Sequence, residues 1–218
     1  KMPLGELGGP DTEMFWDFGP STSSSRGDSI EPGQAFHDEK KYGKHCHVNC
    51  ESGRFIEIGN NVFMEYQRTG KGFEKLKQQN VDFGGGLEPL AAALQNDPDI
   101  FKIDLFDPMR DQLEAISGRR YGEREADNYA FRVILDHLRA ATFLIADGAA
   151  PANKDQGYFT RRLIRRSVRY AHALSITTNF CAGVGERVID VYKEVYADLQ
   201  KKKDFILSEF NAEEQKFR

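Results

Sequence analysis

Five arginines lie within nine residues of this sequence, inside the segment from Asp147 to Tyr170. A guanidinium group stays charged at physiological pH and presents a planar set of donors that suits carboxylate and phosphate oxygens. The whole chain has a net charge of −4, so this positive charge is concentrated against the overall trend. We therefore expect the cluster to bind a polyanion or to face an equally large set of acidic partners. Its members are Arg161, Arg162, Arg165, Arg166 and Arg169.

A helix must position these arginines, because their spacing places them in overlapping rows at 100° per residue. The helix is expected to end near Leu174, and a polar loop precedes it. The segment 127–146 has the strongest amphipathic pattern of the chain and predicts a supporting helix, on which His137 is expected to be a hydrogen-bonded core residue. The arginine helix leaves Leu163, Ile164 and Val168 for burial, and the loop contains Pro151, Asn153 and Gly157.

A second set of residues that could do chemistry lies where a predicted strand meets a predicted helix. The strand runs to a glycine triplet at 84–86, and the helix covers 87–96, where Pro89 is tolerated because it falls in the first turn. Asp82 adds a carboxylate just before the turn. This arrangement could bind a small ligand, but a glycine triplet is more often required by a turn than by a ligand.

Histidines and cysteines in the segment 45–50 suggest a third possibility, a zinc site. On a strand, His45 and His47 would share a face while Cys46 pointed away, so Cys50 and a loop residue such as His37 would have to complete the ligand set. The alternative is a strand that carries polar residues and two unpaired thiols.

The composition limits the protein classes that the chain can belong to. With 218 residues, 39% of them hydrophobic and 29% charged, it can bury one sizeable core or two modest ones. A sequence pI near 5.8 argues against general affinity for nucleic acids or membranes. Three cysteines and no apolar run of about 18 residues predict a soluble, cytoplasmic protein. Because the chain begins at Lys1, we expect it to be cut from a longer protein.

The pattern of the chain changes from strands to helices near residues 97–104. Strands are predicted over 12–18 and 54–68, the second being either one bulged strand or two short ones around Gly59. The Ser/Gly/Pro-rich stretch 20–34 predicts a mobile loop, and its RGD tripeptide at 26–28 is attributed to chance. One helix is predicted over 104–116, and two or three helices are predicted over 181–217, in the segments 185–200 and 204–217. The lysine run 201–203 would be a junction between helices or a solvated face.

Four blocks of the sequence together resemble the alanyl-tRNA synthetase family of class II aminoacyl-tRNA synthetases. The resemblance covers most of residues 5–175, and the last block is specific enough to indicate the family alone. The blocks are GPDTEMFWD (9–17), FIEIGNNVFMEY (55–66), NVDFGGGLE (80–88) and RVILDHLRAATFLIADGAAPANKDQGYFTRRLIRRSVRYA (132–171).

The resemblance implies a fold and a division into domains. Residues 1–100 would be the C-terminal half of a class II catalytic core, and residues 101–218 the helical domain that recognises the tRNA acceptor stem. The expected fold class is therefore α+β, with a partial antiparallel sheet of class II type followed by an all-helical domain. The implied activity is alanine–tRNA ligation with ATP and Mg2+, for which this chain would be incomplete and inactive by itself.

The resemblance also implies roles for particular residues. Asp82 matches the carboxylate that binds the amino group of alanine, and Asn60 lies in the block that lines the amino-acid pocket. Gly84 and Gly86 would keep the floor open for alanine and the adenylate. Asn153 matches the asparagine that lies at the identity base pair of the tRNA(Ala) acceptor stem. The five arginines, 161, 162, 165, 166 and 169, would contact RNA phosphates.

The sequence departs from the family pattern where ATP would bind. Glu88-Pro89 replaces the usual Glu-Arg pair, Leu7-Gly8 replaces the usual Pro-Cys, and nothing resembles the first two class II motifs or an editing domain. These departures leave two alternatives open. One is a non-catalytic, synthetase-like module that binds tRNA, and the other is an α+β domain whose arginines pair with its own acidic residues.

Overall fold

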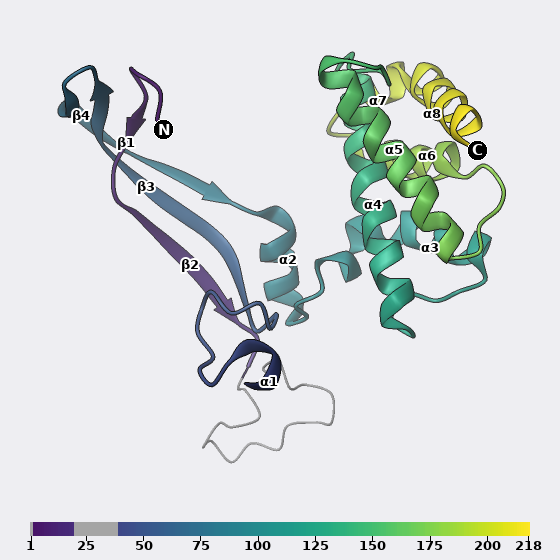
Figure 1. The fold of residues 1–218 in the computed structure, drawn as a ribbon, viewed down its shortest axis with the longest axis horizontal. Helices are drawn as coiled ribbons and strands as arrows, with labels where there is room; N and C mark the ends of the chain where they lie inside the picture. The colour runs from purple at the N-terminus through teal and green to yellow at the C-terminus, as the bar shows by residue number, and fades with distance from the viewer. Residues whose placement is uncertain (1, 20–38) are drawn as a thin grey trace. The chain divides into compact units, whose positions relative to one another are not determined.

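The computed structural model describes residues 2–19 and 39–218, which form two compact units divided between Ile103 and Asp104. The first unit contains the strands, and the second is helical (Figure 1). The expected α+β class, with an antiparallel sheet followed by helices, is confirmed. The predicted mobile loop, its RGD tripeptide and the possible zinc ligand His37 lie outside the described residues.

The long strand β3, Phe55–Thr69, pairs antiparallel with every other strand of the sheet. Of the two forms predicted for 54–68, the structure has the single bulged strand, because the register with β2 skips Ile58. Gly59 is required beside this bulge, since a Cβ there would lie 2.9 Å from the carbonyl oxygen of Gly84. The other strands are β1 (Leu7–Gly8), β2 (Asp11–Asp17) and β4 (Gly72–Gly85).

The sheet exposes large apolar side chains instead of burying them. On β4, Phe73 and Phe83 are 61% and 59% exposed, and Trp16 on β2 is 42% exposed. The described part of this unit buries few apolar side chains, among them Phe18, and two alanines of helix α2 (Leu87–Gln95). Contiguous exposed apolar surface usually marks an interface. The exposed apolar side chains of the sheet are therefore typical of a surface that packs against another polypeptide segment.

The segment before β3 differs from the prediction. Beyond the short helix α1 (Glu39–Tyr42), residues 43–54 form turns and irregular backbone, so His45 and His47 do not lie on a strand. A turn in which the Cys50 N–H donates to the His47 carbonyl, at 2.8 Å, replaces it. In the described residues, no three His, Cys, Asp or Glu side chains are grouped as metal ligands would be, so His45, His47 and Cys50 form no zinc site there.

An ion pair fastens the end of β2 to the start of β3. Two nitrogens of the Arg54 guanidinium take part, since Nε donates to Asp17 Oδ1 and Nη2 donates to Asp17 Oδ2, each at 2.7 Å. The hydrogen bond from Arg54 is the main reason that the pKa of Asp17 lies below its ordinary value of 3.8. Because the folded-state pKa is lowered, the ionised carboxylate stabilises the fold above pH 3.8.

We expect Asp17→Asn to remove one pH-dependent contribution to the stability of the sheet. In the original chain this contribution is lost as the pH falls from 3.8 through the lowered pKa of Asp17. At pH 7 the difference in unfolding free energy should be below about 1 kcal/mol, because the carboxylate is 43% exposed. Urea titrations of both proteins between pH 5 and pH 2 should show this difference shrinking. A constant difference would contradict the assignment.

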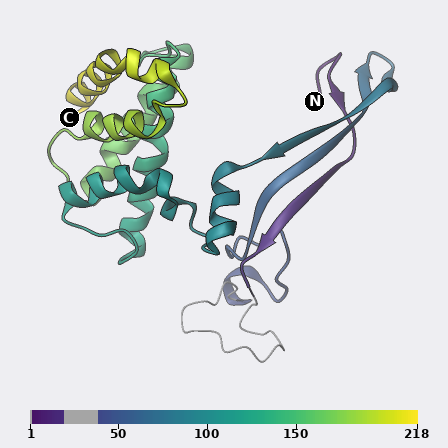
Figure 2. The ribbon, with the colours of Figure 1, turned by 180° about the vertical axis from the view of Figure 1, so that it is seen from behind.

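The helical unit is built on α4, Glu125–Ala146, whose side chains Phe131, Ile134, Leu135 and Leu138 are fully buried. This helix and α5, Asp155–Ala173, confirm the two helices predicted at 127–146 and up to Leu174. Helix α6 lies between α3 and α8 (Figure 2). The remaining elements are η1 (Ile100–Lys102) at the end of the first unit, and η2 (Asp104–Phe106), α3 (Asp107–Ser117), α6 (Cys181–Tyr192), α7 (Ala197–Lys201) and α8 (Lys203–Phe217).

The structure has three helices over 181–217, one of the two numbers predicted, and the segment 185–200 is divided between two of them. The chain turns between α6 and α7, where the Tyr192 carbonyl accepts hydrogen bonds from Val195 and Tyr196. This turn lets the rings of Tyr192 and Tyr196 both pack edge-on against Phe143 of α4, with centroid distances of 5.3 and 5.2 Å. Aromatic packing that arises from tertiary contact thus overrides a helical pattern.

The lysine run 201–203 lies at the junction between α7 and α8. Of the two predicted roles, a helix junction or a solvated face, the junction is confirmed. Two of its ammonium groups are also fixed to other helices. Lys202 donates to the Ala146 carbonyl at the end of α4, and Lys203 pairs with Glu186 of α6, both at 2.6 Å. Among the described helices, none combines the length and the apolar character needed to cross a membrane.

Candidate functional site

Helix α5 positions the arginines by burying its opposite side in the helical unit. Ile164 and Val168 are buried as predicted. Leu163 is only half-buried, because it lies beside the arginines on the exposed side of the helix. The loop before α5 is held close to it, since Thr160 Oγ1 donates to the Ala149 carbonyl at 2.7 Å. At Gly157, a Cβ would collide with the Ala150 carbonyl oxygen, so only glycine permits this approach.

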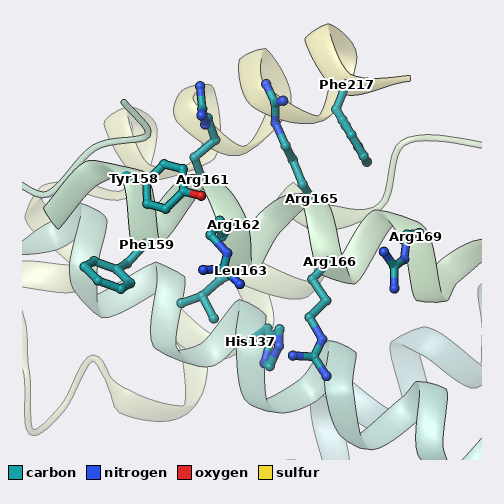
Figure 3. Close-up of a pocket in the computed structure, with 10 residues that line it drawn as sticks. All are labelled: His137, Tyr158, Phe159, Arg161, Arg162, Leu163, Arg165, Arg166, Arg169 and Phe217. Atoms are coloured by element: carbon teal, nitrogen blue, oxygen red, sulfur yellow. The ribbon is translucent and has the colours of Figure 1, made fainter. Parts of the chain in front are cut away.

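A groove of about 700 Å³ runs along the exposed side of α5 (Figure 3). We call it the arginine groove. Helix α4 contributes His137 to it and α8 contributes Phe217, so three helices form its walls. All five predicted arginines line it. The residues that line the groove are His137, Tyr158, Phe159, Arg161, Arg162, Leu163, Arg165, Arg166, Arg169 and Phe217.

Arg165 is bound to another part of the protein. Its Nε donates to Glu213 Oε1 of α8 at 2.5 Å, and that carboxylate side chain is only 7% exposed. Its guanidinium also lies over the ring of Phe217, 5.0 Å from the centroid (Figure 3). The expectation that arginines pair internally is thus met by one member of the cluster. We infer that Arg165 joins α5 to α8.

Four arginines of the groove have no such carboxylate, and three of them are exposed. Arg162, Arg166 and Arg169 are exposed, and no ion pair joins them to an acidic residue in the described part of the chain. Aromatic rings lie under them instead: Arg162 is 5.7 Å from the centroid of Tyr158, and Arg166 is 5.7 Å from that of Tyr170. Rings limit the motion of a guanidinium without neutralising its charge. These three groups are therefore available to an anion.

Two groups beside the groove have lowered pKa values to which its arginines contribute. The pKa of Tyr170 is lowered, first by a hydrogen bond with Tyr129 and then by Arg166 and Arg169. The pKa of Asp136 is also lowered, mainly by its 2.9 Å contact with His137 and further by Arg139 and Arg166. Both shifts favour the anionic form. A phosphate in the groove would be stabilised by the same cations.

Asn153 lies in the loop at the start of α5, where its side chain is exposed. Its Oδ1 accepts a hydrogen bond from Arg161 Nη1, and the Arg161 guanidinium lies 5.4 Å from the centroid of Tyr158. This contact orients the amide without using the two donors on Nδ2. The structure thus brings Asn153 to the arginines that were predicted to act with it.

The predicted small-ligand residues come together on one face of the sheet. Asn60 pairs with Gly84 and Val62 pairs with Asp82, so these side chains project from the same face. A Cβ on Gly84 would lie 3.2 Å from Asn60 Oδ1, so glycine leaves room for the amide. Asp82 and Gly84 are exposed. This face has the chemistry to bind an ammonium group, but the described residues do not enclose it.

Gly86 ends this face and begins helix α2. A Cβ on Gly86 would lie 2.8 Å from Cγ of Pro89, so the proline ring packs where the glycine has no side chain. Pro89 therefore occupies the first turn of α2, as predicted, and adds an apolar ring beside the glycines. Because the proline side chain has no charge, helix α2 has no cationic group at position 89.

Two residues that contact Arg165 were not predicted from the sequence. Glu213 and Phe217 lie 48 and 52 positions after Arg165, and no local pattern connects them with it. Tyr158 and Phe159 of the groove were not predicted either, but they could have been found, because they lie just before Thr160 and the arginines and continue the helical spacing.

Comparisons with known proteins agree with the resemblance of the sequence blocks. The family model described as "tRNA synthetases class II (A)" matches residues 8–218. Relatives named alanine–tRNA ligase include one from Borrelia hermsii, 40% identical over 220 residues, and one from Bacillus pumilus, 38% identical over 210 residues. These alignments cover 99% and 96% of this chain, but only 34% and 22% of the two relatives. The chain thus spans about a third of the first relative.

Proposed function

This chain belongs to the class II (A) family of tRNA synthetases, and we propose that it is part of an enzyme that activates alanine with ATP and transfers it to tRNA(Ala). The observation that carries the proposal is the arginine groove. It provides three exposed guanidinium groups, an adjacent amide and aromatic rings in a chain of net negative charge. Phosphate contacts by such groups position a nucleic acid without reading its sequence.

The helical unit is proposed to bind the acceptor stem of the tRNA. Arg162, Arg166 and Arg169 would contact phosphates, while Arg165 supports the wall of the groove. Asn153 would donate to base edges through Nδ2, because the wide, shallow minor groove of RNA exposes those edges to an amide. Arg161 would keep this amide oriented through the hydrogen bond that it already makes.

The sheet is proposed to bind alanine and the adenylate. Asp82 would pair with the ammonium group, Asn60 would line the pocket, and Gly84 and Gly86 would leave space for the substrate. ATP with Mg2+ would be the second substrate. The metal and cationic groups would stabilise charge as the carboxylate of alanine attacks the α-phosphate and displaces pyrophosphate, which leaves the adenylate. Because Asp82 is exposed and the sheet surface is apolar, we infer that polypeptide beyond these 218 residues closes the pocket and supplies the missing cations.

A cytoplasmic location without membrane contact is part of the proposal. The three cysteines, Cys46, Cys50 and Cys181, form no disulfide. Free thiols are typical of reducing compartments, where disulfides rarely persist.

The test uses the complete protein and alanine-dependent exchange between ATP and pyrophosphate. We expect Asp82→Asn to lower kcat/KM for alanine by roughly 30- to 5,000-fold, because removing one partner of an enclosed charge pair costs about 2–5 kcal/mol. Glu74→Gln on the same strand is a matched control that should leave exchange unchanged. If the complete protein shows no alanine-dependent exchange, the proposal is wrong.

A second candidate, a non-catalytic module that binds tRNA, is favoured by Pro89 alone. Proline has no cation with which to hold ATP. In the complete protein, Pro89→Arg should raise the affinity for ATP if the site is that of an enzyme with a weakened contact. Unchanged ATP affinity, together with absent exchange and retained tRNA binding, would favour the non-catalytic module.

A further inference from the structure

One exposed face of α5 begins with an aromatic side chain and continues with arginines. Residues 159, 162, 166 and 169 follow each other at spacings of three and four, so Phe159, Arg162, Arg166 and Arg169 lie in one row along the helix. These are the three exposed arginines of the cluster, and none of them has a described acidic partner. Phe159 is about 4.5 Å from the first of them along the helix axis. We call these four residues the exposed row.

Phe159 contributes little to the packing of the protein. It is 62% exposed, whereas Ile164 and Val168 on the same helix are buried. Its described ring contact is an edge-on one with Tyr158, at a centroid distance of 6.1 Å. Tyr158 is itself 38% exposed and has the guanidinium groups of Arg161 and Arg162 near its ring. The two rings therefore lie next to each other in the groove (Figure 3). Guanidinium groups lie over the ring of Tyr158, whereas the ring of Phe159 is exposed to solvent.

Resting on the proposed function, we propose that Phe159 stacks on an unpaired base of the RNA whose phosphates Arg162, Arg166 and Arg169 hold. A strand that follows these arginines brings its next nucleotide to the open ring of Phe159. A base has an apolar face that stacks on an aromatic ring whatever its sequence, while the adjacent guanidinium groups attract its phosphate. The groove would thus distinguish an RNA with an unpaired nucleotide from a plain duplex.

Charge complementarity selects RNA as the occupant of this surface. The exposed row has three positive charges and no described ion pair, so an apolar protein surface would leave these charges without partners. The phosphates of an RNA backbone would form ion pairs with the arginines, and an unpaired base would stack on the ring of Phe159. If Phe159 served to bind another protein instead, Phe159→Ala would weaken binding to neither RNA hairpin in the test below.

The experiment measures binding of the 218-residue chain to two RNA hairpins that share one stem. One hairpin is blunt, and the other has a short single-stranded 3′ extension. We expect tighter binding to the extended hairpin, and we expect Phe159→Ala to weaken that binding by roughly 5- to 150-fold, with little change for the blunt hairpin. The salt dependence of both should be unchanged, because no phosphate contact is lost.

Three further variants make this test specific. Phe159→Trp should retain the preference for the extended hairpin, since it keeps an aromatic face, and Phe159→Leu should lose it. Phe205→Ala is the matched control, because Phe205 is also an exposed phenylalanine, 45% exposed on α8, and does not line the groove. Urea denaturation should give equal stabilities for Phe159→Ala and the original chain.

The failure of this inference differs from the failure of the proposed function. An equal loss on both hairpins, or no loss on either, would contradict stacking while salt-dependent binding still supports the arginine contacts. If the original chain bound neither hairpin, both proposals would be overturned.

Discussion

Replacing Arg162, Arg166 and Arg169 together by glutamine is expected to weaken binding to an acceptor-stem RNA by roughly 100- to 1,000-fold at about 0.1 M salt. Each phosphate contact releases condensed counterions, so the slope of log K against log salt should become shallower by about 2.7 for three contacts on a duplex. The structure selects these three because they are exposed and make no ion pair with a described acidic residue. Fluorescence anisotropy in a salt series measures both quantities.

A matched variant separates local contacts from net charge. Replacing Arg120, Arg124 and Arg187 by glutamine removes the same charge from the helical unit at positions outside the arginine groove. We expect at most a few-fold loss of affinity and no change in slope. If the two triple variants behaved alike, the attraction would be general, and the groove would have no special role.

Arg165→Gln should have a different effect from its neighbours. The substitution leaves Glu213, which is almost fully buried, without its cation. The cost should therefore appear mainly in the stability of the contact between α5 and α8, and the salt slope of RNA binding should change less than for Arg166→Gln.

Substituting Glu214 is expected to have the largest effect on folding. Its carboxylate is fully buried and accepts hydrogen bonds from the N–H groups of Phe180 and Cys181, at 3.0 and 2.9 Å, where α6 begins. Its other oxygen accepts from Arg218 Nε at 3.0 Å. Alanine would leave two buried N–H groups without acceptors and would remove the carboxylate that pairs with Arg218, at a cost of about 3–5 kcal/mol.

Urea denaturation followed by far-ultraviolet circular dichroism measures this cost. Glu214→Gln should be roughly half as destabilising, because the amide keeps one acceptor and loses the charge. Glu194→Gln is the control, since Glu194 is exposed between α6 and α7, and it should change stability by less than about 0.5 kcal/mol. A loss below about 1 kcal/mol for Glu214→Ala would contradict the anchoring role.

Sequence reasoning found the elements whose patterns are local. Helices α4 and α5 follow from apolar periodicity, and the strands from β-prone runs that end at glycines. The pairing of Asn60 with Gly84, which places both beside Asp82, also fits residues that were expected to share a site. Periodicity decides which face of an element is buried, and so it indicates which residues share a face.

Contacts between distant parts of the chain could not be found in this way. Nothing near Arg165 indicates that Glu213 will neutralise it, so all five arginines appeared equivalent. The turn between α6 and α7 depends on Phe143, about fifty residues earlier, and the helical pattern continued across it. Leu163 was assigned to the core by spacing, although the edge of the groove leaves it half-buried.

The most direct test of the central claim is whether the 218-residue chain recognises tRNA(Ala) acceptor-stem RNA. Affinities should be measured for a hairpin with the acceptor stem of tRNA(Ala) and for the same hairpin with its identity base pair replaced. We predict salt-dependent binding to both, with a preference of about tenfold for the first that Asn153→Ala removes. Equal affinities for the two hairpins, or binding that does not respond to salt, would contradict the account.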